Sequence, residues 1–184
     1  MCKEKKYKIS VIISGGQTGA DRGGLDFAIS ADIKHGGWCP LGRKAEDGII
    51  PDKYSLKETT VILYPARTRM NIRDSDATIV FSSNLNSKGT ILTTRLCQEL
   101  RKPYITILIP QTNLKQYPNQ EICDQLLEWL KTTKPSILNI AGSRESHCPG
   151  LGKFVKQILS KILTNSKKEK EWPPKRPTTP NLPL

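Results

Sequence analysis

The segment KISVIISGGQTGADRGGLDFAIS, residues 8–30, contains the strongest structural signal in the chain. It begins with an apolar run rich in Val and Ile that ends at Ile13, which is typical of a strand covered on both faces in a parallel sheet. Two consecutive glycines follow. Residues 20–30 then carry apolar side chains at helical spacing, with Asp21 near the start, where a carboxylate suits the helix dipole. The segment therefore predicts a strand, a glycine-rich turn and a helix.

The same alternation continues along the chain. Four apolar runs predict further strands, at 60–64, 77–81, 103–109 and 136–140. Three stretches with helical spacing predict helices: one that opens at 89–90, one marked by apolar residues between 122 and 130, and one over 151–163. Residues 34–53 are polar and glycine-rich and predict a long loop. Strands that alternate with amphipathic helices indicate an α/β fold with a mostly parallel sheet covered on both faces.

Length and composition indicate one folded domain. The chain has 184 residues, of which 36% are hydrophobic and 25% charged, and this excludes disorder along its whole length. The longest strongly apolar run, residues 104–109, is far shorter than the ~20 residues that span a bilayer. The five cysteines form no Cys-x-x-Cys pair and there are two histidines, so neither a zinc site nor a disulfide framework is indicated. We therefore expect a soluble, cytoplasmic protein without a metal site.

The net charge of +12 is unevenly distributed. Residues 1–8 and residues 164–184 each carry a net charge of +3, which leaves +6 for the body. We expect a basic N-terminal extension (1–8), a ligand-binding domain (9–165) and a disordered Lys/Pro-rich tail (166–184). A positive field can steer nucleic acid, an anionic membrane surface or phosphorylated small molecules, and solubility alone explains it equally well.

The turn after the first strand is the first of four candidate binding loops, because ligands in open α/β sheets bind beyond the carboxyl ends of strands. Its glycines allow a ligand to approach the backbone, and N–H groups at a helix N-terminus favour phosphate. The spacing matches neither Gly-x-Gly-x-x-Gly nor the Walker pattern, which argues against an ordinary dinucleotide site or an NTPase. The candidate ligand contacts in this turn are Gly15, Gly16, Gln17, Thr18, Gly19 and Asp21.

The other three loops combine basic residues, glycines and carboxylates. Residues 67–76 offer guanidinium and hydroxyl groups for an oxyanion and carboxylates for a sugar or pterin, or else form a capped helix end. Residues 84–90 suit a second cluster of amide groups, and residues 139–146 suit a polar rim. Residues 38–48 suit a lid over a planar ring, in which Cys39 is more typical of packing than of chemistry. The candidates in the three loops are Arg67, Thr68, Asn71, Asp74, Asp76, Lys88, Gly89, Thr90, Gly142, Arg144 and Glu145.

Taken together and in this order, these segments resemble the molybdenum carrier family. This family is a branch of the Rossmann-like superfamily that includes the YpsA-like (SLOG) proteins, the cytokinin-activating phosphoribohydrolases and the DNA-processing protein DprA. The resemblance runs from about residue 12 to about residue 163. It is carried by residues 14–21, 37–40, 46–48, 67, 68, 71, 74–76, 89, 90, 141, 142 and 144–146.

The resemblance implies a Rossmann-like three-layer α/β/α fold with a pocket for the molybdenum cofactor (molybdopterin) or for a nucleotide. Residues 15, 16, 18 and 19 would cradle the phosphate, residues 89 and 90 would supply facing amide groups, and residues 67, 71 and 76 would line the pocket. The phosphoribohydrolase branch has Gly-Gly-x-Gly-Thr-x-x-Glu, whereas this chain has Ser87-Lys88 before Gly89-Thr90 and has Thr93 at the position of the Glu. Without that carboxylate, cleavage of an N-glycosidic bond loses its charge-stabilising group.

Three functions remain open from the sequence. The first is a carrier or sensor that binds a small phosphorylated ligand, with no catalytic residues and with molybdoenzymes or cofactor-insertion proteins as its partners. The second is a nucleotide-processing enzyme of the phosphoribohydrolase type. The third, single-stranded nucleic-acid binding, is the least favoured, because aromatic residues make up only 6% of the chain and such binders use aromatic stacking platforms. Homo-oligomers are expected by analogy with the superfamily, and membrane binding is not.

Overall fold

The computed structural model describes residues 8–109, 114 and 119–163. In this part of the chain, five parallel strands form a central sheet in the order β2-β1-β9-β7-β8. They are β1 (Val11–Ile13), β2 (Lys34–Gly36), β7 (Ala77–Ser82), β8 (Tyr104–Leu108) and β9 (Ile137–Gly142). The sheet confirms the prediction of a Rossmann-like α/β fold. The expected tail, and the extension apart from Lys8, lie outside the described residues.

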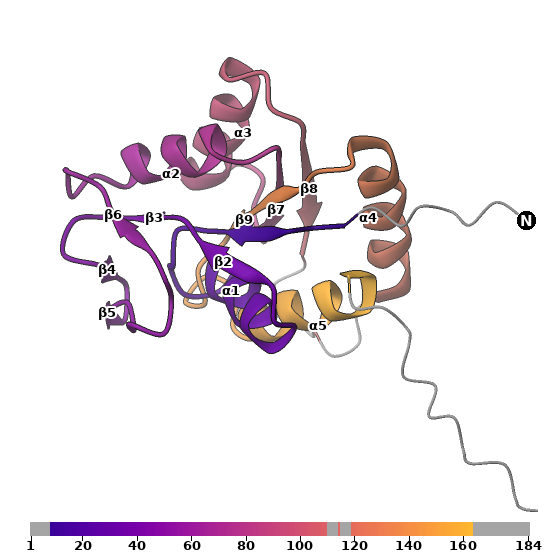
Figure 1. Ribbon diagram of the computed structural model, residues 1–184, viewed down its shortest axis with the longest axis horizontal. Coiled ribbons are helices and arrows are strands. Elements are labelled where there is room, and N and C mark those ends of the chain that lie inside the picture. Colours follow the sequence, from indigo (N-terminus) through magenta and orange to yellow (C-terminus); the bar gives the residue numbers. More distant parts are fainter. Residues whose placement is uncertain (1–7, 110–113, 115–118, 164–184) are drawn as a thin grey trace, which may run out of the picture.

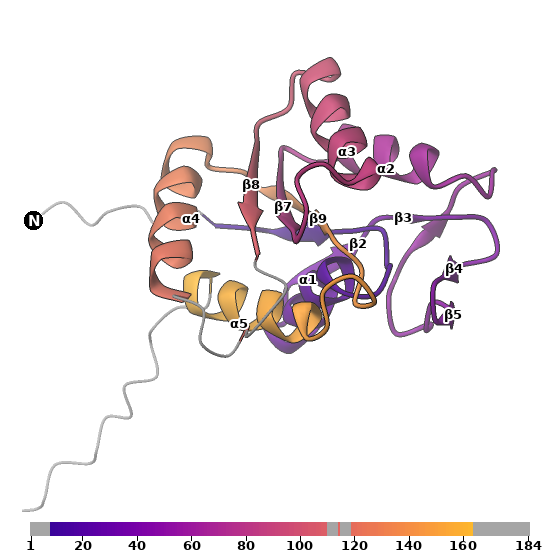
Figure 2. The ribbon, with the colours of Figure 1, turned by 180° about the vertical axis from the view of Figure 1, so that it is seen from behind.

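Helices cover both faces of the sheet. They are α1 (Ala20–Ser30), α2 (Tyr64–Arg73), α3 (Lys88–Glu99), α4 (Asn119–Thr133) and α5 (Leu151–Leu163). Helices α2 and α3 lie together on one face, and α1 and α5 lie on the other with α4 beside them (Figures 1 and 2). The larger apolar core is on the side of α1, α4 and α5, where Phe27, Leu126 and Ile158 pack against strand residues such as Leu138.

The strand order places a topological switch in the middle of the sheet. From β1 the chain crosses to β2 at one edge, and from β7 it crosses to β8 at the other edge. The last strand, β9, enters between β1 and β7, with Leu138 opposite Ile12 and Ile140 opposite Ile79. The loops that leave β1, β7 and β9 therefore diverge from one region of the carboxyl edge, which is where open α/β sheets bind ligands.

Residues 37–58, which we call the clasp segment, form a small β-rich extension beyond the carboxyl end of β2 (Figure 1). It contains β3 (Trp38–Cys39), β4 (Lys44–Ala45), β5 (Gly48–Ile49) and β6 (Lys57–Glu58). Strand β3 pairs with β6 in parallel and β4 pairs with β5 in antiparallel. Its small core, Cys39, Ile50 and Tyr54, packs against Leu25 of α1.

Two predicted elements are corrected by the structure. The predicted loop over 34–53 contains β2 and three of the short strands, because an edge strand paired on one side needs no apolar pattern. The predicted strand over 60–64 is absent from the described chain, since residues 60–62 form a bend and Tyr64 begins α2 with Pro65 in its first turn. Residues 67–76, expected as a binding loop or else as a capped helix end, are mostly helix, as α2 runs to Arg73 and ends at the C-cap Asp74.

None of the helices in the described residues has both the length and the apolar character that a membrane span requires.

Candidate functional site

A cavity of about 120 Å³ opens at the carboxyl edge of the sheet, at the topological switch. Its walls come from the turn after β1, the inner face of α2, the first turns of α3 and the end of β9. The predicted site residues that line it are Gln17, Asp21, Arg67, Thr68, Asn71, Gly89, Thr90, Gly142 and Arg144. The fold thus brings together residues from all four predicted loops.

A buried ion pair crosses the cavity wall. Arg67 Nη1 of α2 donates to Asp21 Oδ2 of α1 at 2.8 Å, and the two side chains are only 15% and 4% exposed. Burial raises the pKa of the Asp21 carboxyl above its ordinary value, while the charge of Arg67 acts to lower it. The pair fixes the guanidinium from one end. Arg67 Nε is buried and has no hydrogen-bond partner among the described residues.

Gln17 supplies a second unpaired donor. Its Oε1 accepts hydrogen bonds from the main-chain N–H of Thr18 at 3.0 Å and of Glu46 at 2.9 Å. Because both groups are donors, they fix which end of the side-chain amide is the oxygen. The other end, Nε2, is buried without a partner in the described chain. Unsatisfied buried donors are rare and costly in folded proteins, and these two belong to residues that line one cavity.

The N-terminus of α3 forms the opposite wall. Ser87 caps it by accepting from Thr90 N at 3.2 Å, and Thr90 Oγ1 lies 2.7 Å from Ser82 Oγ at the end of β7. Gly89, in the first turn, has open space where a Cβ would stand. Its N–H belongs to the positive end of the helix dipole, which favours an anion.

Tyr64 is a site residue that the sequence analysis missed. Its ring lies near two guanidinium groups, with the centroid 5.9 Å from Arg67 Cζ and 5.3 Å from Arg144 Cζ. Four residues of α2 at positions i, i+3, i+4 and i+7 line the cavity: Tyr64, Arg67, Thr68 and Asn71. A helix prediction for this segment would have placed all four on one face. Thr93 and Asn139 also line the cavity.

Several N–H groups of the glycine-rich turn after β1 are bonded within the chain. Asp21 accepts from Gln17 N at 3.3 Å and also from Gly15 N, and Ala20 N donates to Ser143 O at 3.1 Å. The chain itself therefore uses these donors. The glycines are needed for close packing instead: a Cβ on Gly15 would lie 1.5 Å from Arg67 Nη1, and one on Gly19 would lie 2.5 Å from Ser143 O.

The remaining predicted residues do not line the cavity. Gly16 packs against Leu56, and the Thr18 hydroxyl donates to Glu46. Asp74 accepts from Trp38 Nε1 at 2.7 Å.

Asp76, Glu145 and Lys88 are also outside it. Asp76 lies at the amino end of β7, where it accepts from Ser136 N and Ile137 N at 2.9 and 2.8 Å. Glu145 accepts from the main-chain N–H of Gly150 at 2.5 Å and of Gly152 at 3.0 Å, next to the start of α5. Lys88 is exposed.

Asn71 lines the cavity, but both ends of its amide hold the main chain of Trp38, at 2.8 and 2.9 Å. Cys39 is buried, and burial raises the pKa of its thiol. Over the residues that the structure describes, no group of three His, Cys, Asp or Glu side chains is placed to hold a metal ion.

Comparison with known proteins agrees with this architecture. The model of the circularly permutated YpsA SLOG family matches residues 12–163. A crystal structure at 1.45 Å resolution, described as "Putative molybdenum carrier protein" from Syntrophus aciditrophicus SB, is 36% identical and superposes with a TM-score of 0.80. The match covers 89% of this chain and 100% of that chain. None of the curated proteins compared with the chain matches it. The chain belongs to the circularly permutated YpsA SLOG family.

Proposed function

We propose that this protein binds a small phosphate-bearing ligand, with the molybdenum cofactor as the first candidate, and holds it as a carrier. The observation that supports this proposal is the pair of buried, unpaired donors beside one cavity, Gln17 Nε2 and Arg67 Nε. Arg144 and the N-terminus of α3 add positive charge and dipole to the same walls. The likeness to a protein described as a molybdenum carrier adds weight to the cofactor over other phosphate compounds.

The size of the cavity limits what enters it. Its volume of about 120 Å³ is well below the roughly 300–1,000 Å³ of pockets for drug-sized ligands, and is close to the ~150 Å³ of an engineered cavity that binds benzene. A phosphate group suits this volume, whereas a fused pterin or a purine does not. The phosphate of the ligand would therefore occupy the cavity, with the rest of the molecule near Tyr64 and Arg144. The molybdenum cofactor, when bound, supplies the metal, and the residues of this chain hold only its phosphate end.

The position of Asp21 and Arg67 suits an oxyanion. A guanidinium N–H forms a charge-assisted hydrogen bond with a phosphate oxygen, and it does so best when the orientation of the guanidinium is fixed. Asp21 holds Nη1, and Nε lies on the other edge of the group. A phosphate oxygen that accepts from Nε and another that accepts from Gln17 Nε2 would satisfy both orphan donors. Binding would then regain the free energy that the unpaired groups cost.

Binding is favoured over cleavage. Asp21 is the one carboxylate among the described residues that line the cavity, and it is engaged by Arg67. Thr93 lines the cavity where the phosphoribohydrolase pattern has a Glu. A hydroxyl cannot replace that carboxylate in stabilising positive charge on a sugar.

Two measurements test this function. Calorimetric titration with inorganic phosphate should show binding, and the Gln17→Glu variant should bind at least about tenfold more weakly (about 1.4 kcal/mol). This variant keeps an oxygen that can accept from Thr18 and Glu46 but replaces the Nε2 donor by a carboxylate oxygen. Equal affinity in the variant and the wild type would contradict the proposed site.

The second measurement identifies the ligand. Native mass spectrometry of the protein purified from its own cells should show a bound mass, and a molybdopterin mass separates the cofactor from a nucleotide. Release of free base from nucleoside monophosphates would instead establish the enzymatic alternative.

A further inference from the structure

Glu46, in the β4–β5 turn of the clasp segment, contacts both the turn after β1 and the turn after β9. Its main-chain N–H donates to Gln17 Oε1 at 2.9 Å. Its carboxylate accepts from the Thr18 hydroxyl, from Ser146 N at 3.2 Å and from Ser146 Oγ at 2.6 Å. Thr18 Oγ1 in turn accepts from Glu145 N at 3.2 Å. Glu46 therefore connects the turn after β1 to the turn after β9.

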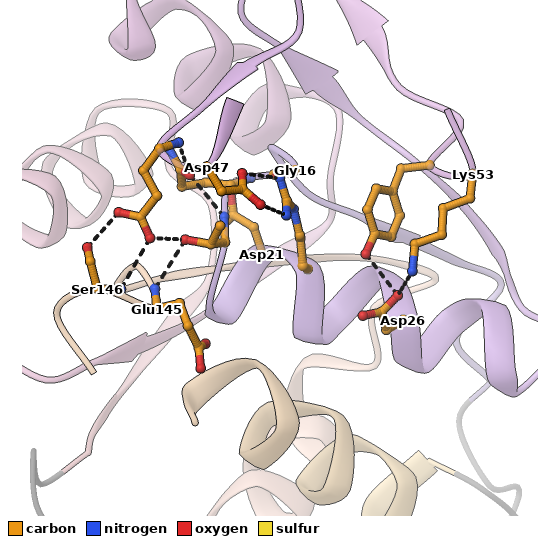
Figure 3. A network of polar contacts seen from close by, with 12 residues as sticks. Gly16, Asp21, Asp26, Asp47, Lys53, Glu145 and Ser146 are labelled. Carbon is orange, nitrogen blue, oxygen red and sulfur yellow. Dashed lines mark hydrogen bonds and ion pairs between the residues drawn. The ribbon is translucent and has the colours of Figure 1, made fainter. Parts of the chain in front are cut away.

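The clasp segment has other ties to α1 that do not reach the cavity. Asp47 forms a two-pronged ion pair with Arg22, at 2.5 and 2.8 Å. Asp26 accepts from Lys53 Nζ and from Tyr54 Oη, both at 2.9 Å (Figure 3). None of these five residues lines the described cavity. Glu46, by contrast, contacts Gln17, which lines the cavity.

We infer that Glu46 is a positioning residue of the anion site, which fixes the Gln17 amide so that its Nε2 donor is available beside the cavity. The inference rests on the proposed function. An amide side chain held at Oε1 by two N–H groups cannot turn without losing both hydrogen bonds. If the Glu46 N–H is removed, only the Thr18 N–H at 3.0 Å restrains it. The Glu46 carboxylate holds the β4–β5 turn in place by its contacts with Thr18 and Ser146. The contact with Ser146 also holds the turn after β9, which carries Arg144 at the cavity.

Three substitutions separate the contributions of Glu46. Glu46→Ala removes the carboxylate and keeps the N–H. Glu46→Pro removes both; Glu46 does not have the positive φ that proline cannot adopt, and the residue before it, Ala45, is extended. Glu46→Gln keeps an oxygen for Thr18 and Ser146. Asp47→Asn is the matched control, since it weakens the neighbouring tie to Arg22 but touches no residue that lines the cavity.

The first readout uses the protein without added ligand. The side-chain amide resonances of Gln17 in ¹H–¹⁵N spectra should shift and broaden in Glu46→Pro, and less in Glu46→Ala, because the amide gains rotational freedom. They should stay as in the wild type in Asp47→Asn and Glu46→Gln. Unchanged Gln17 resonances in Glu46→Pro would overturn the inference, whatever the protein binds.

The second readout is the affinity for inorganic phosphate. We expect the affinity for phosphate to fall about tenfold in Glu46→Ala and further in Glu46→Pro. At metal sites, losing a residue that positions a ligand lowers the affinity by about 10–100-fold, and the value expected for Glu46→Ala is at the lower end of this range. Glu46→Gln should restore most of the affinity and Asp47→Asn should retain it. Equal losses in the Glu46 and Asp47 variants would mean that Glu46 only stabilises the fold, and this overturns the inference alone. A wild-type protein that binds no phosphate would overturn the proposed function, and with it the inference.

Discussion

Asp21 Oδ2 lies 2.8 Å from Arg67 Nη1, so two residues 46 positions apart join α1 to α2 at the wall of the cavity. Asp21 is buried and the Arg67 side chain is 15% exposed, and burial raises the pKa of Asp21. A buried ion pair of this kind is weak evidence for stability by itself, but breaking it by removing one partner is costly. Its geometry is better explained by the orientation that it gives the guanidinium.

Arg67→Ala is therefore expected to destabilise the fold by about 3–5 kcal/mol at neutral pH, because it leaves the Asp21 carboxylate buried without its counterion. The loss of stability should be smaller in acid. Burial raises the pKa of Asp21, so its carboxyl is protonated there, and a neutral carboxyl needs no counterion. Urea unfolding at neutral and at acidic pH measures both values. The double variant Arg67→Ala with Asp21→Asn should recover part of the loss, and no recovery would show that the pair does not carry the effect.

Gly15 tests whether the position of Arg67 matters for binding. In Gly15→Ala the added Cβ would lie 1.5 Å from Arg67 Nη1 and 2.8 Å from Asp21 Oδ2, so the guanidinium must move. We expect a loss of stability of about 1–3 kcal/mol and a much weaker affinity for phosphate. Gly89→Ala is the control for stability, because open space surrounds its Cβ position and its backbone has no positive φ. In urea unfolding, the midpoint concentration of Gly89→Ala should be no lower than that of the wild type. A Gly15→Ala variant with wild-type stability and affinity would contradict the described packing.

Asp76 provides the opposite case, a predicted site residue that the fold uses elsewhere. Its carboxylate accepts from Ser136 N and Ile137 N at the amino end of the sheet. Asp76→Ala should lower the free energy of unfolding by about 1.5–3 kcal/mol, because it removes a charged acceptor shared by two main-chain N–H groups, and it should not change the phosphate affinity. Calorimetry and urea unfolding on the same sample check the two parts. A change in phosphate affinity would show that Asp76 does contribute to the ligand site, contrary to this prediction.

Elements with a regular apolar pattern could be predicted from the sequence. Helix α1 begins at Ala20 and ends at Ser30 as predicted, because its apolar residues face the sheet and α5. Helix α2 could not be predicted in the same way: only Asn71 and Ile72 in it are fully buried, and its inner face is polar because it lines the cavity. Strand β2 is short, polar and at a sheet edge, so it has no alternation to detect.

The candidate site shows the same limit. Residue types indicated an anion site at the carboxyl edge, and Gln17 and Arg67 do line the cavity there. What the sequence could not show is which donors the chain itself consumes. Asp21 lies in the first turn of α1 and lines the cavity, as expected, and it also accepts N–H groups of its own turn and holds Arg67, which the sequence did not indicate. Such contacts between distant segments depend on tertiary structure, which has no local sequence pattern.

The contacts of Glu46 predict how the clasp segment responds to acid. Burial acts to raise the pKa of Glu46, but hydrogen bonds from Ser146 and Thr18 together with the charge of Arg144 leave it below the ordinary value of 4.5. A carboxyl whose pKa is lower in the folded state stabilises that state above its ordinary pKa, and this contribution is lost as the pH falls through the folded value. The contacts of the clasp segment with Ser146 should therefore loosen below pH 4.5.

Amide hydrogen exchange at Ser146 and Gln17, measured as a function of pH, reports this loosening. Arg22 lowers the pKa of the Asp47 carboxyl, so the ion pair between these two residues also weakens in acid. Comparing the wild type with Glu46→Gln isolates the contribution of Glu46, because both proteins keep Asp47. The Gln variant should lose the part of the acid dependence at Ser146 that belongs to Glu46, and an identical pH profile in both proteins would show that Glu46 does not control the opening.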